Sequence, residues 1–249
     1  VGFEKVVTRE IGDDTAPTRV TRHTYNTGRD NFPLRGMLLE ESVEGDDGAV
    51  YSVESKEYAT PLLFTGPDGS ESFAPYESVT VRTLVEGGAA PPKTVRTETV
   101  QDEYGNETEL REWGIVEGDD FLAGGDERIT RMEYALNLDA WIIHAPSRIE
   151  ILDGEHNPLT LSLLYYDDET YSAENYGEVV RGGQTLEVGY YDLEDPEGYV
   201  LSERVKYDAY GNVVAALDEM AEAPGGVIDD GVGHYRTFTF DPHFRTFPT

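Results

Sequence analysis

The chain has 249 residues, 38% of them hydrophobic and 11% aromatic, which is too apolar for a disordered chain and long enough for one large domain or two smaller ones. Its 50 acidic residues outnumber 19 basic ones and leave a net charge of -31, so binding to nucleic acid or to anionic lipid is unfavourable. The absence of cysteine excludes disulfides, thiolate zinc sites and cysteine nucleophiles.

An acidic, lysine-poor surface also suits a high-salt habitat, where salt screens self-repulsion. Every apolar run falls short of the roughly 18 residues that a membrane span requires. The first residues, Val1 to Lys5, carry neither a start methionine nor a signal-peptide pattern, and the last residues form no terminating motif. We therefore expect both ends to be cut from a longer chain.

The predicted elements are short strands separated by turns. Residues rich in Thr, Val and Tyr alternate with polar residues, as in a strand with one buried face, in Val79 to Val85, Thr94 to Val100 and Leu201 to Tyr207. Turn pairs stand at Asp46 to Gly48, Gly66 to Gly69, Asp153-Gly154 and Glu197-Gly198. This order predicts an all-β fold, an antiparallel meander of β-hairpins. One helix is expected, from Val213 to Ala223.

Internal repetition is the most informative signal in the chain. The segment from Arg19 to Tyr25 resembles the segment from Arg128 to Tyr134, at an offset of 109 residues. Asp102 to Asn106 resembles Asp208 to Asn212 at an offset of 106 residues, and Tyr235 to Asp241 reads as the opening of another unit. We therefore expect a first repeat unit over residues 1–118 and a second over 119–249, with the start of a third, all within a larger chain.

The motif Tyr207-Asp208-Ala-Tyr-Gly211-Asn212 predicts a strand that ends in a hairpin turn. The Tyr207 ring can pack on a neighbouring side chain, and Asp208 can accept a bond from the backbone two residues on. Gly211 and Asn212 are the residue types that best tolerate left-handed φ. Seven residues are expected to form the turns and pack the strands: Asp102, Gly105, Asn106, Tyr207, Asp208, Gly211 and Asn212.

This Tyr-Asp-x-x-Gly-Asn pattern resembles the YD repeats of Rhs proteins, teneurins and the B component of tripartite insecticidal Tc toxins. The chain is also similar to the middle region of Tc B components and plasmid-virulence relatives. That similarity covers Leu34 to Leu39, Asp126 to Tyr134, Asp139 to Ile143, Pro146 to Ile149, Phe240 to Pro242 and Phe247 to Thr249. It is weakest between about Thr60 and Pro92, and at Gly225 to Gly231.

The resemblance implies that the chain is a segment of wall in a secreted shell. In that family a ribbon of hairpins spirals into a hollow cocoon, which encloses a C-terminal toxin. The implied partners are the remaining Rhs/YD-repeat shell and the enclosed toxin cargo, of the same or a partner chain. We see neither the β-propeller repeats that close the shell in the family, nor a cleavage motif, nor a toxin domain.

Candidate catalytic and metal-binding residues have weak support, and we expect no catalytic residue, metal or cofactor. The acidic groups Asp119-Asp120, Asp167 to Glu169 and Asp229-Asp230 are expected in solvated loops, because none has EF-hand spacing. The five histidines have no HxH or HExxH spacing, and His23 is expected as a satisfied strand residue. Tyr165-Tyr166, Tyr190-Tyr191, Trp113 and Trp141 are expected to pack a sheet.

We therefore expect a structural, non-catalytic segment of a toxin-encapsulating shell. An alternative from another class is a surface-binding or adhesion module, which would present an exposed aromatic patch to a glycan or partner. A third is a carbohydrate-active enzyme, which would need two carboxylates facing each other about 5–10 Å apart.

Overall fold

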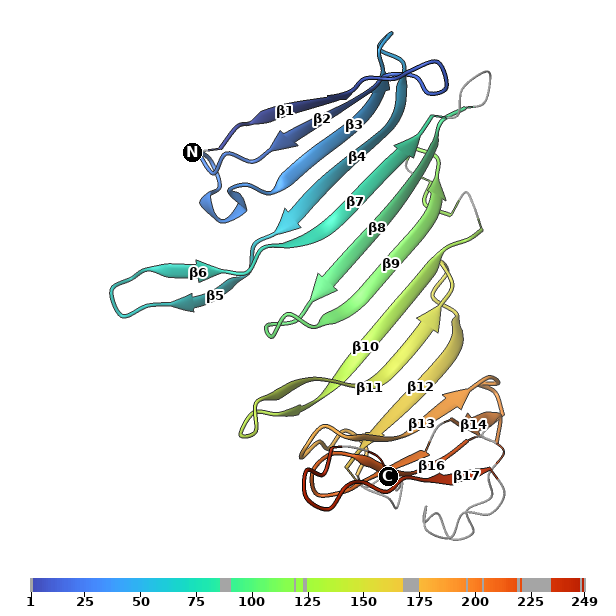
Figure 1. Cartoon of the computed structure of the whole chain (residues 1–249). Helices are drawn as coiled ribbons and strands as arrows, with labels where there is room; N and C mark the ends of the chain where they lie inside the picture. Colours follow the sequence, from blue (N-terminus) through green and yellow to red (C-terminus); the bar gives the residue numbers. More distant parts are fainter. Residues whose placement is uncertain are drawn as a thin grey trace. The chain divides into compact units, whose positions relative to one another are not determined.

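The structure, a computed structural model, describes residues 2–85, 91–118, 120–122, 125–167, 175–195, 197–202, 204–218, 220, 234–246 and 248. Within these residues the chain forms β-strands joined by tight turns, and its one helical element is the three-residue 3-10 turn Phe32–Leu34 (Figure 1). Paired strands run antiparallel, and successive strands are mostly neighbours. The predicted all-β hairpin meander is confirmed.

Two compact units divide the chain, Val1–Ile129 and Thr130–Thr249. These units are defined by contacts between residues, whereas the repeat boundary expected near residue 118 is a statement about sequence. That boundary stays a prediction.

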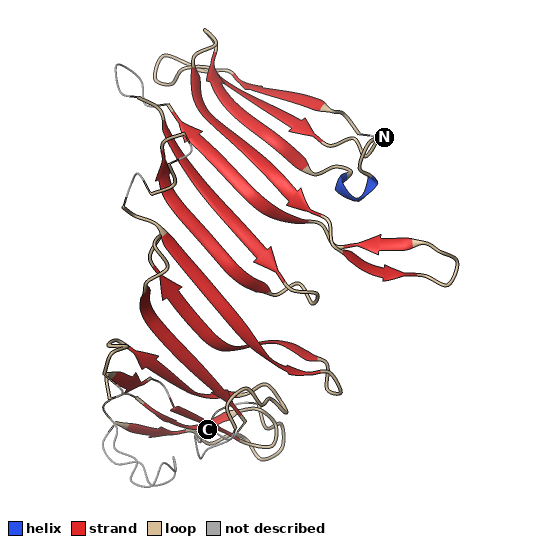
Figure 2. Cartoon of the chain, turned by 180° about the vertical axis from the view of Figure 1, so that it is seen from behind, coloured by secondary structure: helices blue, strands red, loops and turns tan. Residues whose placement is uncertain are grey.

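The first unit contains a sheet with the strand order β1-β2-β3-β4-β7-β8-β9. Strand β7 pairs directly with β4, so the hairpin β5–β6 is an excursion between them, and it projects away from the sheet in both Figure 1 and Figure 2. The strands are β1 Lys5–Glu10, β2 Arg19–Tyr25, β3 Leu38–Gly45, β4 Val50–Ala59, β5 Leu62–Thr65, β6 Glu71–Phe73, β7 Tyr76–Leu84, β8 Lys93–Gln101 and β9 Glu107–Val116. Strands β7 and β8 fulfil two of the sequence-based expectations.

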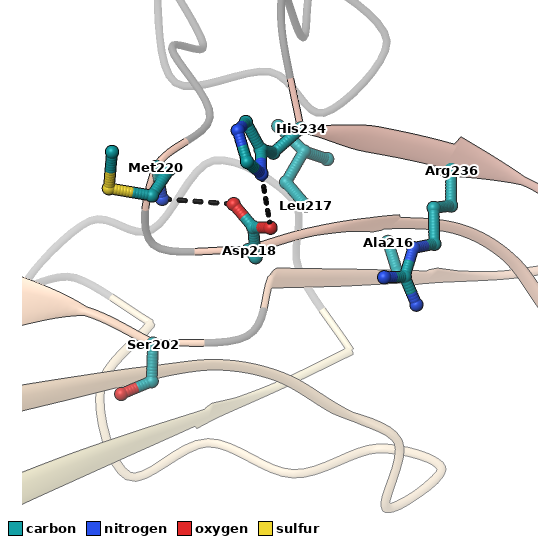
Figure 3. Close-up of a pocket in the computed structure, with 7 residues that line it drawn as sticks. All are labelled: Ser202, Ala216, Leu217, Asp218, Met220, His234 and Arg236. Atoms are coloured by element: carbon teal, nitrogen blue, oxygen red, sulfur yellow. Dashed lines mark hydrogen bonds and ion pairs between the residues drawn. The ribbon is translucent and has the colours of Figure 1, made fainter.

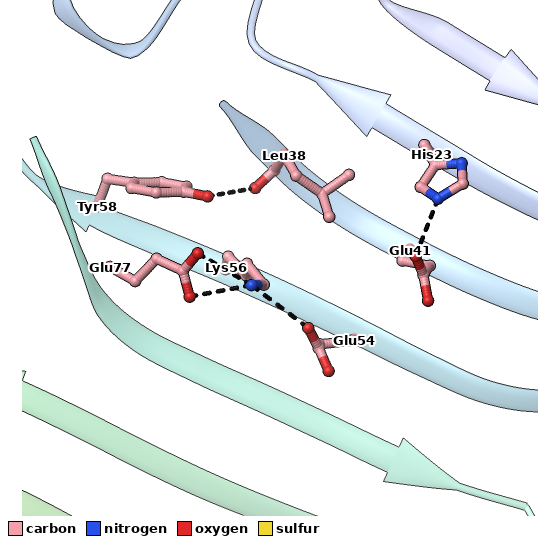
Figure 4. A network of polar contacts seen from close by, with 7 residues as sticks. All are labelled: His23, Leu38, Glu41, Glu54, Lys56, Tyr58 and Glu77. Carbon is pink, nitrogen blue, oxygen red and sulfur yellow. Dashed lines mark hydrogen bonds and ion pairs between the residues drawn. The ribbon is translucent and has the colours of Figure 1, made fainter. Parts of the chain in front are cut away.

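Cross-strand polar pairs add to the backbone ladder of this sheet, which has little packed core. The most buried apolar side chains of β1 to β9 are still 8 or 9% exposed. Lys56 Nζ lies 2.9 Å from Glu77 on the adjacent strand and 3.5 Å from Glu54 on its own strand (Figure 4). Pairs of this kind contribute roughly 0.2–1 kcal/mol each. The backbone ladder therefore contributes most of the order in this sheet.

The second unit has a small apolar core. Five of its strands are neighbours in the order β10-β11-β12-β13-β14, and a separate sheet has the order β15-β16-β17. Ala135, Ala145, Leu164, Tyr166 and Val179 are 6% exposed or less and form one cluster. The strands are β10 Arg128–Asn137, β11 Ile142–Leu152, β12 Pro158–Tyr166, β13 Gln184–Tyr190, β14 Tyr199–Leu201, β15 Arg204–Tyr207, β16 Val213–Leu217 and β17 Tyr235–Thr237.

The helix expected from Val213 to Ala223 is wrong over its first five residues, which form β16. Ala215 and Leu217 are 2% and 0% exposed, while Val214 and Ala216, which alternate with them, are only partly buried, and this is the period of a strand. Strands β15 and β17 pair with β16 on its two edges. Residues 219 and 221–223 of that prediction lie outside the described residues.

The single strand expected from Leu201 to Tyr207 is also wrong. Leu201 ends β14, which pairs with β13, whereas Arg204 begins β15, which pairs with β16 in the other sheet. The Ser202 amide still donates to the Glu187 carbonyl at 2.9 Å, so the backbone is bonded to β13 as far as that residue. An alternating pattern alone does not show that its two halves belong to different sheets.

Candidate functional site

The first copy of the sequence motif forms a five-residue turn between β8 and β9, closed by its own polar groups. The Asp102 amide donates to the Asn106 carbonyl at 2.9 Å, and the Gly105 amide donates to the Asp102 carbonyl at 3.2 Å. Asp102 Oδ1 accepts from the amides of Tyr104 and Asn106 at 2.8 and 2.9 Å. Asp102 Oδ2 accepts from Asn106 Nδ2 at 2.8 Å. We call this set of side-chain bonds the Asp–Asn clasp.

The second copy, between β15 and β16, has the same geometry. Asp208 Oδ1 accepts from the amides of Tyr210 and Asn212 at 2.8 and 3.0 Å, and Asp208 Oδ2 accepts from Asn212 Nδ2 at 3.0 Å. Asn212 Nδ2 also donates to the Arg245 carbonyl at 2.7 Å. The Arg245 guanidinium lies over the Tyr210 ring, 4.5 Å from its centre. This turn therefore also holds the segment around Arg245.

A third clasp lies between β11 and β12, where the sequence predicts a turn at Asp153-Gly154 but not its likeness to the other two. Asp153 Oδ1 accepts from the Glu155 and Asn157 amides at 3.0 and 2.8 Å, and Oδ2 accepts from Asn157 Nδ2 at 2.9 Å. The fourth residue of this turn is His156, at φ 70°, where the other two clasps have glycine. The spacing Asp-x-x-x-Asn is the signal that all three share.

Two further turns share the backbone closure without the clasp, at residues 45–49 and 66–70. In both, the first amide donates to the fifth carbonyl and the fourth amide donates to the first carbonyl. Their fourth residues, Gly48 and Gly69, have φ of 82° and 81°, close to 85° at Gly105 and 82° at Gly211. Glycine adopts this left-handed conformation without steric cost, so it suits this position.

Tyr207 ends β15 and fixes the turn to the neighbouring sheet, within the second unit. Its hydroxyl donates to the Gln184 carbonyl at 3.0 Å. A Cβ placed on Gly183 would lie 3.1 Å from the Tyr207 ring, so the ring packs directly on that glycine. The register of β15 against β16 shifts by one residue just before Tyr207.

Two other tyrosines share this arrangement. The Tyr166 hydroxyl donates to the Pro146 carbonyl and the Tyr58 hydroxyl donates to the Leu38 carbonyl, each at 2.8 Å. A register shift precedes both tyrosines as well. Burial raises the pKa of Tyr166 to about 12, with smaller contributions from Asp167 and Tyr134, so the hydroxyl keeps its proton and donates.

Asp167 follows Tyr166, and its carboxylate is bound by a run of backbone amides. Oδ2 accepts from Val180, Arg181 and Gly182 at 2.7, 2.8 and 3.1 Å, and Oδ1 accepts from Gly183 at 3.0 Å. A cavity of about 620 Å³ separates this carboxylate from the turn that begins at Asp208. Sequence comparison treated Asp167 as part of an acidic loop and missed this role.

Bonds to their side chains lower the pKa of the clasp aspartates. The Asn212 and Asn157 amides are the main reason that the pKa values of Asp208 and Asp153 lie below the ordinary value. At Asp102 burial acts in the opposite direction, but the bonds from Asn106 and from backbone amides outweigh it. At Asp167 burial is likewise outweighed by the four amides. All four are acceptors in their ionised form.

The remaining polar candidates have structural partners. His23 Nε2 lies 2.9 Å from Glu41 on the next strand, although its buried Nδ1 has no partner. A cavity of about 400 Å³ contains the His234–Asp218 pair at 2.9 Å, with Ser202 apart from that pair (Figure 3). In the described part of the chain, no three His, Asp or Glu side chains converge as a metal site would require. Asp119, Asp168, Glu169, Asp229 and Asp230 lie outside it.

The aromatic residues expected to pack a sheet divide into two sets. Trp113 stacks on Phe121, Tyr165 contacts Tyr176 and Tyr190 contacts Tyr199, while Tyr166 is 6% exposed. Trp141 and Tyr191, in contrast, are 69% and 68% exposed. The alternative of a surface-binding module stays a prediction.

One solved structure has a fold similar to that of this chain. No family model matches the sequence, and no curated protein matches it. The solved crystal structure of TcdB2-TccC3 aligns with the whole of this chain at a TM-score of 0.67 and 11% identity. The chain has a fold like that of a Tc toxin component.

This chain spans 20% of the TcdB2-TccC3 chain that it matches. A porin-like protein from Bacteroides uniformis aligns over 94% of this chain and 95% of its own, but at a TM-score of 0.27 and 12% identity, which is too low to bear on the fold. Among the described residues, no helix has the length and apolarity to cross a membrane.

Proposed function

We propose that this chain is a structural segment of a secreted, toxin-encapsulating Rhs/YD-repeat shell, like that of a Tc toxin B component, with no catalysis of its own. The observation that carries the proposal is the match of the entire chain to one fifth of a Tc toxin component. The chain would be one stretch of a longer wall. Its partners would be the rest of that shell and the toxin cargo inside it.

The clasped turns support this function on physical grounds. A wall needs many hairpins whose register is fixed locally, because its strands cannot all surround one central core. Each clasp ties its first residue to its fifth through both carboxylate oxygens, as at Asp102 and Asn106. The tyrosines then tie strand ends to neighbouring strands, as Tyr207 does to Gln184.

The polar pairs among strands β1 to β9 of the first unit are consistent with a barrier as well. Its strands are joined by a continuous ladder in the order β1-β2-β3-β4-β7-β8-β9, which leaves few free strand edges. Side chains such as Glu44, Arg96 and Glu98 form ion pairs on its surface. A charged surface of this kind tolerates contact with water, and a hydrogen-bonded sheet leaves no gap between its strands through which another molecule could cross.

The test is protection of cargo in the full-length protein that contains this chain. Its cargo should resist added protease, whereas a variant carrying Gly105→Val and Gly211→Val should release or expose cargo. Gly189→Ala is the matched control, since Gly189 lies in a strand without positive φ. Cargo that is digested as fast in the wild-type protein as when it is expressed alone would rule out encapsulation.

A further inference from the structure

Strand β5 of the hairpin β5–β6 exposes three consecutive large apolar side chains. Leu62, Leu63 and Phe64 are 51, 55 and 60% exposed, although a chain of this charge has many polar residues with which to cover a surface. The hairpin projects from the ends of β4 and β7 (Figures 1 and 2). Exposed apolar groups that adjoin one another mark interaction sites.

The hairpin is nevertheless well formed. At its tip the Gly66 amide donates to the Ser70 carbonyl and the Gly69 amide donates to the Gly66 carbonyl at 2.9 Å, and at its base the Ala74 amide donates to the Pro61 carbonyl at 3.1 Å. A lone two-stranded hairpin is marginally stable in water, and a third strand with an apolar face is the usual remedy. The hairpin therefore has the geometry to accept a third strand, which would stabilise it.

Strand β5 is the edge that an added strand would use. In the described part of the chain β5 pairs with β6 and with no other strand, so the backbone groups on its outer edge are open. Its four residues, Leu-Leu-Phe-Thr, contain no charge and no proline, two of the features that block edge pairing, and its one irregularity is a register shift against β6 between Leu62 and Phe64. Strand β6, in contrast, carries Glu71.

Charge selects among the partners. Every charged residue between Thr60 and Tyr76 is acidic, namely Asp68 and Glu71, and both lie at or near the tip. A second copy of this chain would bring the same acidic tip and a net charge of -31, so self-pairing is disfavoured. A basic polypeptide would be attracted, and lipid offers no backbone groups for the open edge.

We propose that β5 binds an extended segment of another polypeptide by strand addition, a segment with alternating apolar residues and with lysine or arginine at the end that lies beside Asp68 and Glu71. The backbone edge supplies the hydrogen bonds, Leu62, Leu63 and Phe64 supply the apolar contact, and the tip supplies the charge. The proposal holds whether or not the chain belongs to a shell.

The test uses the 249-residue chain and the labelled peptide Lys-Lys-Val-Thr-Val-Thr-Val-Thr, whose lysines reach the tip when it lies antiparallel to β5. Fluorescence anisotropy should show saturable binding, weakened about tenfold or more by Phe64→Lys, since each 1.4 kcal/mol of lost contact is a factor of ten. Phe32→Lys is the matched control, because Phe32 is 71% exposed elsewhere in the same unit. It should bind as the wild type does.

A second variant removes the hairpin. Ala59 and Tyr76 are partners across β4 and β7, so an Asn-Gly turn can replace residues 60–75 and leave the sheet intact by circular dichroism. This variant should not bind the peptide. Equal binding by this variant, equal binding of a backbone-methylated peptide, hairpin-dependent binding to phosphatidylcholine vesicles, or a dimer that Phe64→Lys dissociates would each overturn the proposal.

Discussion

Replacing Gly211 with alanine isolates the energetic cost of the left-handed position in a clasped turn. Gly211 has φ 82°, and an added Cβ would meet no atom within 4 Å, so the methyl group itself causes no clash. The conformation costs an L-residue roughly 1–2 kcal/mol. Alanine also restricts the unfolded chain more than glycine does, and this restriction raises the free energy of unfolding by about 0.4–1 kcal/mol. We therefore expect a net loss of roughly 1 kcal/mol in the free energy of unfolding.

Two companion variants separate this cost from the effect of a methyl group. Gly189→Ala adds a Cβ at an ordinary 3.7 Å from Val200, without positive φ, and should stabilise the chain by about 0.4–1 kcal/mol. His156→Gly changes the fourth residue of the third clasp from histidine at φ 70° to glycine. It should remove strain and stabilise by up to about 1 kcal/mol.

Urea unfolding followed by far-ultraviolet circular dichroism measures all three variants, since all lie in the second unit. Gly211→Ala should have the lowest midpoint, with the wild type between it and the other two. If Gly211→Ala and Gly189→Ala unfold at the same urea concentration, the left-handed residue does not limit the stability of the turn, and the reasoning is refuted.

Three further predictions concern charge and hydrogen bonding. Because the folded-state pKa of Asp167 is depressed, its stabilisation is present above the ordinary pKa of 3.8 and is lost as pH falls through the lower folded value, so Asp167→Asn should show a smaller acid-dependent loss in acid titration. Tyr166→Phe removes the hydrogen bond to the Pro146 carbonyl and should lower the free energy of unfolding, measured in urea, by about 0.5–1.5 kcal/mol. With a net charge of -31, added NaCl should raise the urea midpoint, and a flat or falling midpoint would contradict salt adaptation.

The sequence predicts the fold class and most of the tight turns, including those at Asp46 to Gly48, Gly66 to Gly69 and Asp153-Gly154, because those features are local. Alternation in Thr94 to Val100 is enough to place β8. The residue pair Gly-Asn marks the hairpin turn at both of its positions in this chain, 105–106 and 211–212. The sequence motif did not reveal the third clasp, because His156 occupies the left-handed position that glycine occupies in the other two. Histidine tolerates that conformation better than most residues but does not signal it.

Non-local features could not be predicted in the same way. Ala215, Ala216 and Leu217 are good helix formers, yet pairing with strands on both edges decides their conformation. The amides that bind Asp167 are 13 to 16 residues further along the chain. No periodicity links a carboxylate to backbone groups at that distance, since the fold alone brings them together.

With three clasps, the recurring element of the chain is about half as long as the 106-residue offset between the two sequence motifs. The clasp aspartates are Asp102, Asp153 and Asp208, so the third clasp divides the 106-residue offset nearly in half. Each clasp forms its Asp–Asn bonds within five residues, and at the second clasp Asn212 Nδ2 donates to the Arg245 carbonyl as well. Substitutions in separate clasps should therefore have additive effects on stability. A wall extended hairpin by hairpin needs this independence, because a fault in one turn then leaves the register of the others unchanged.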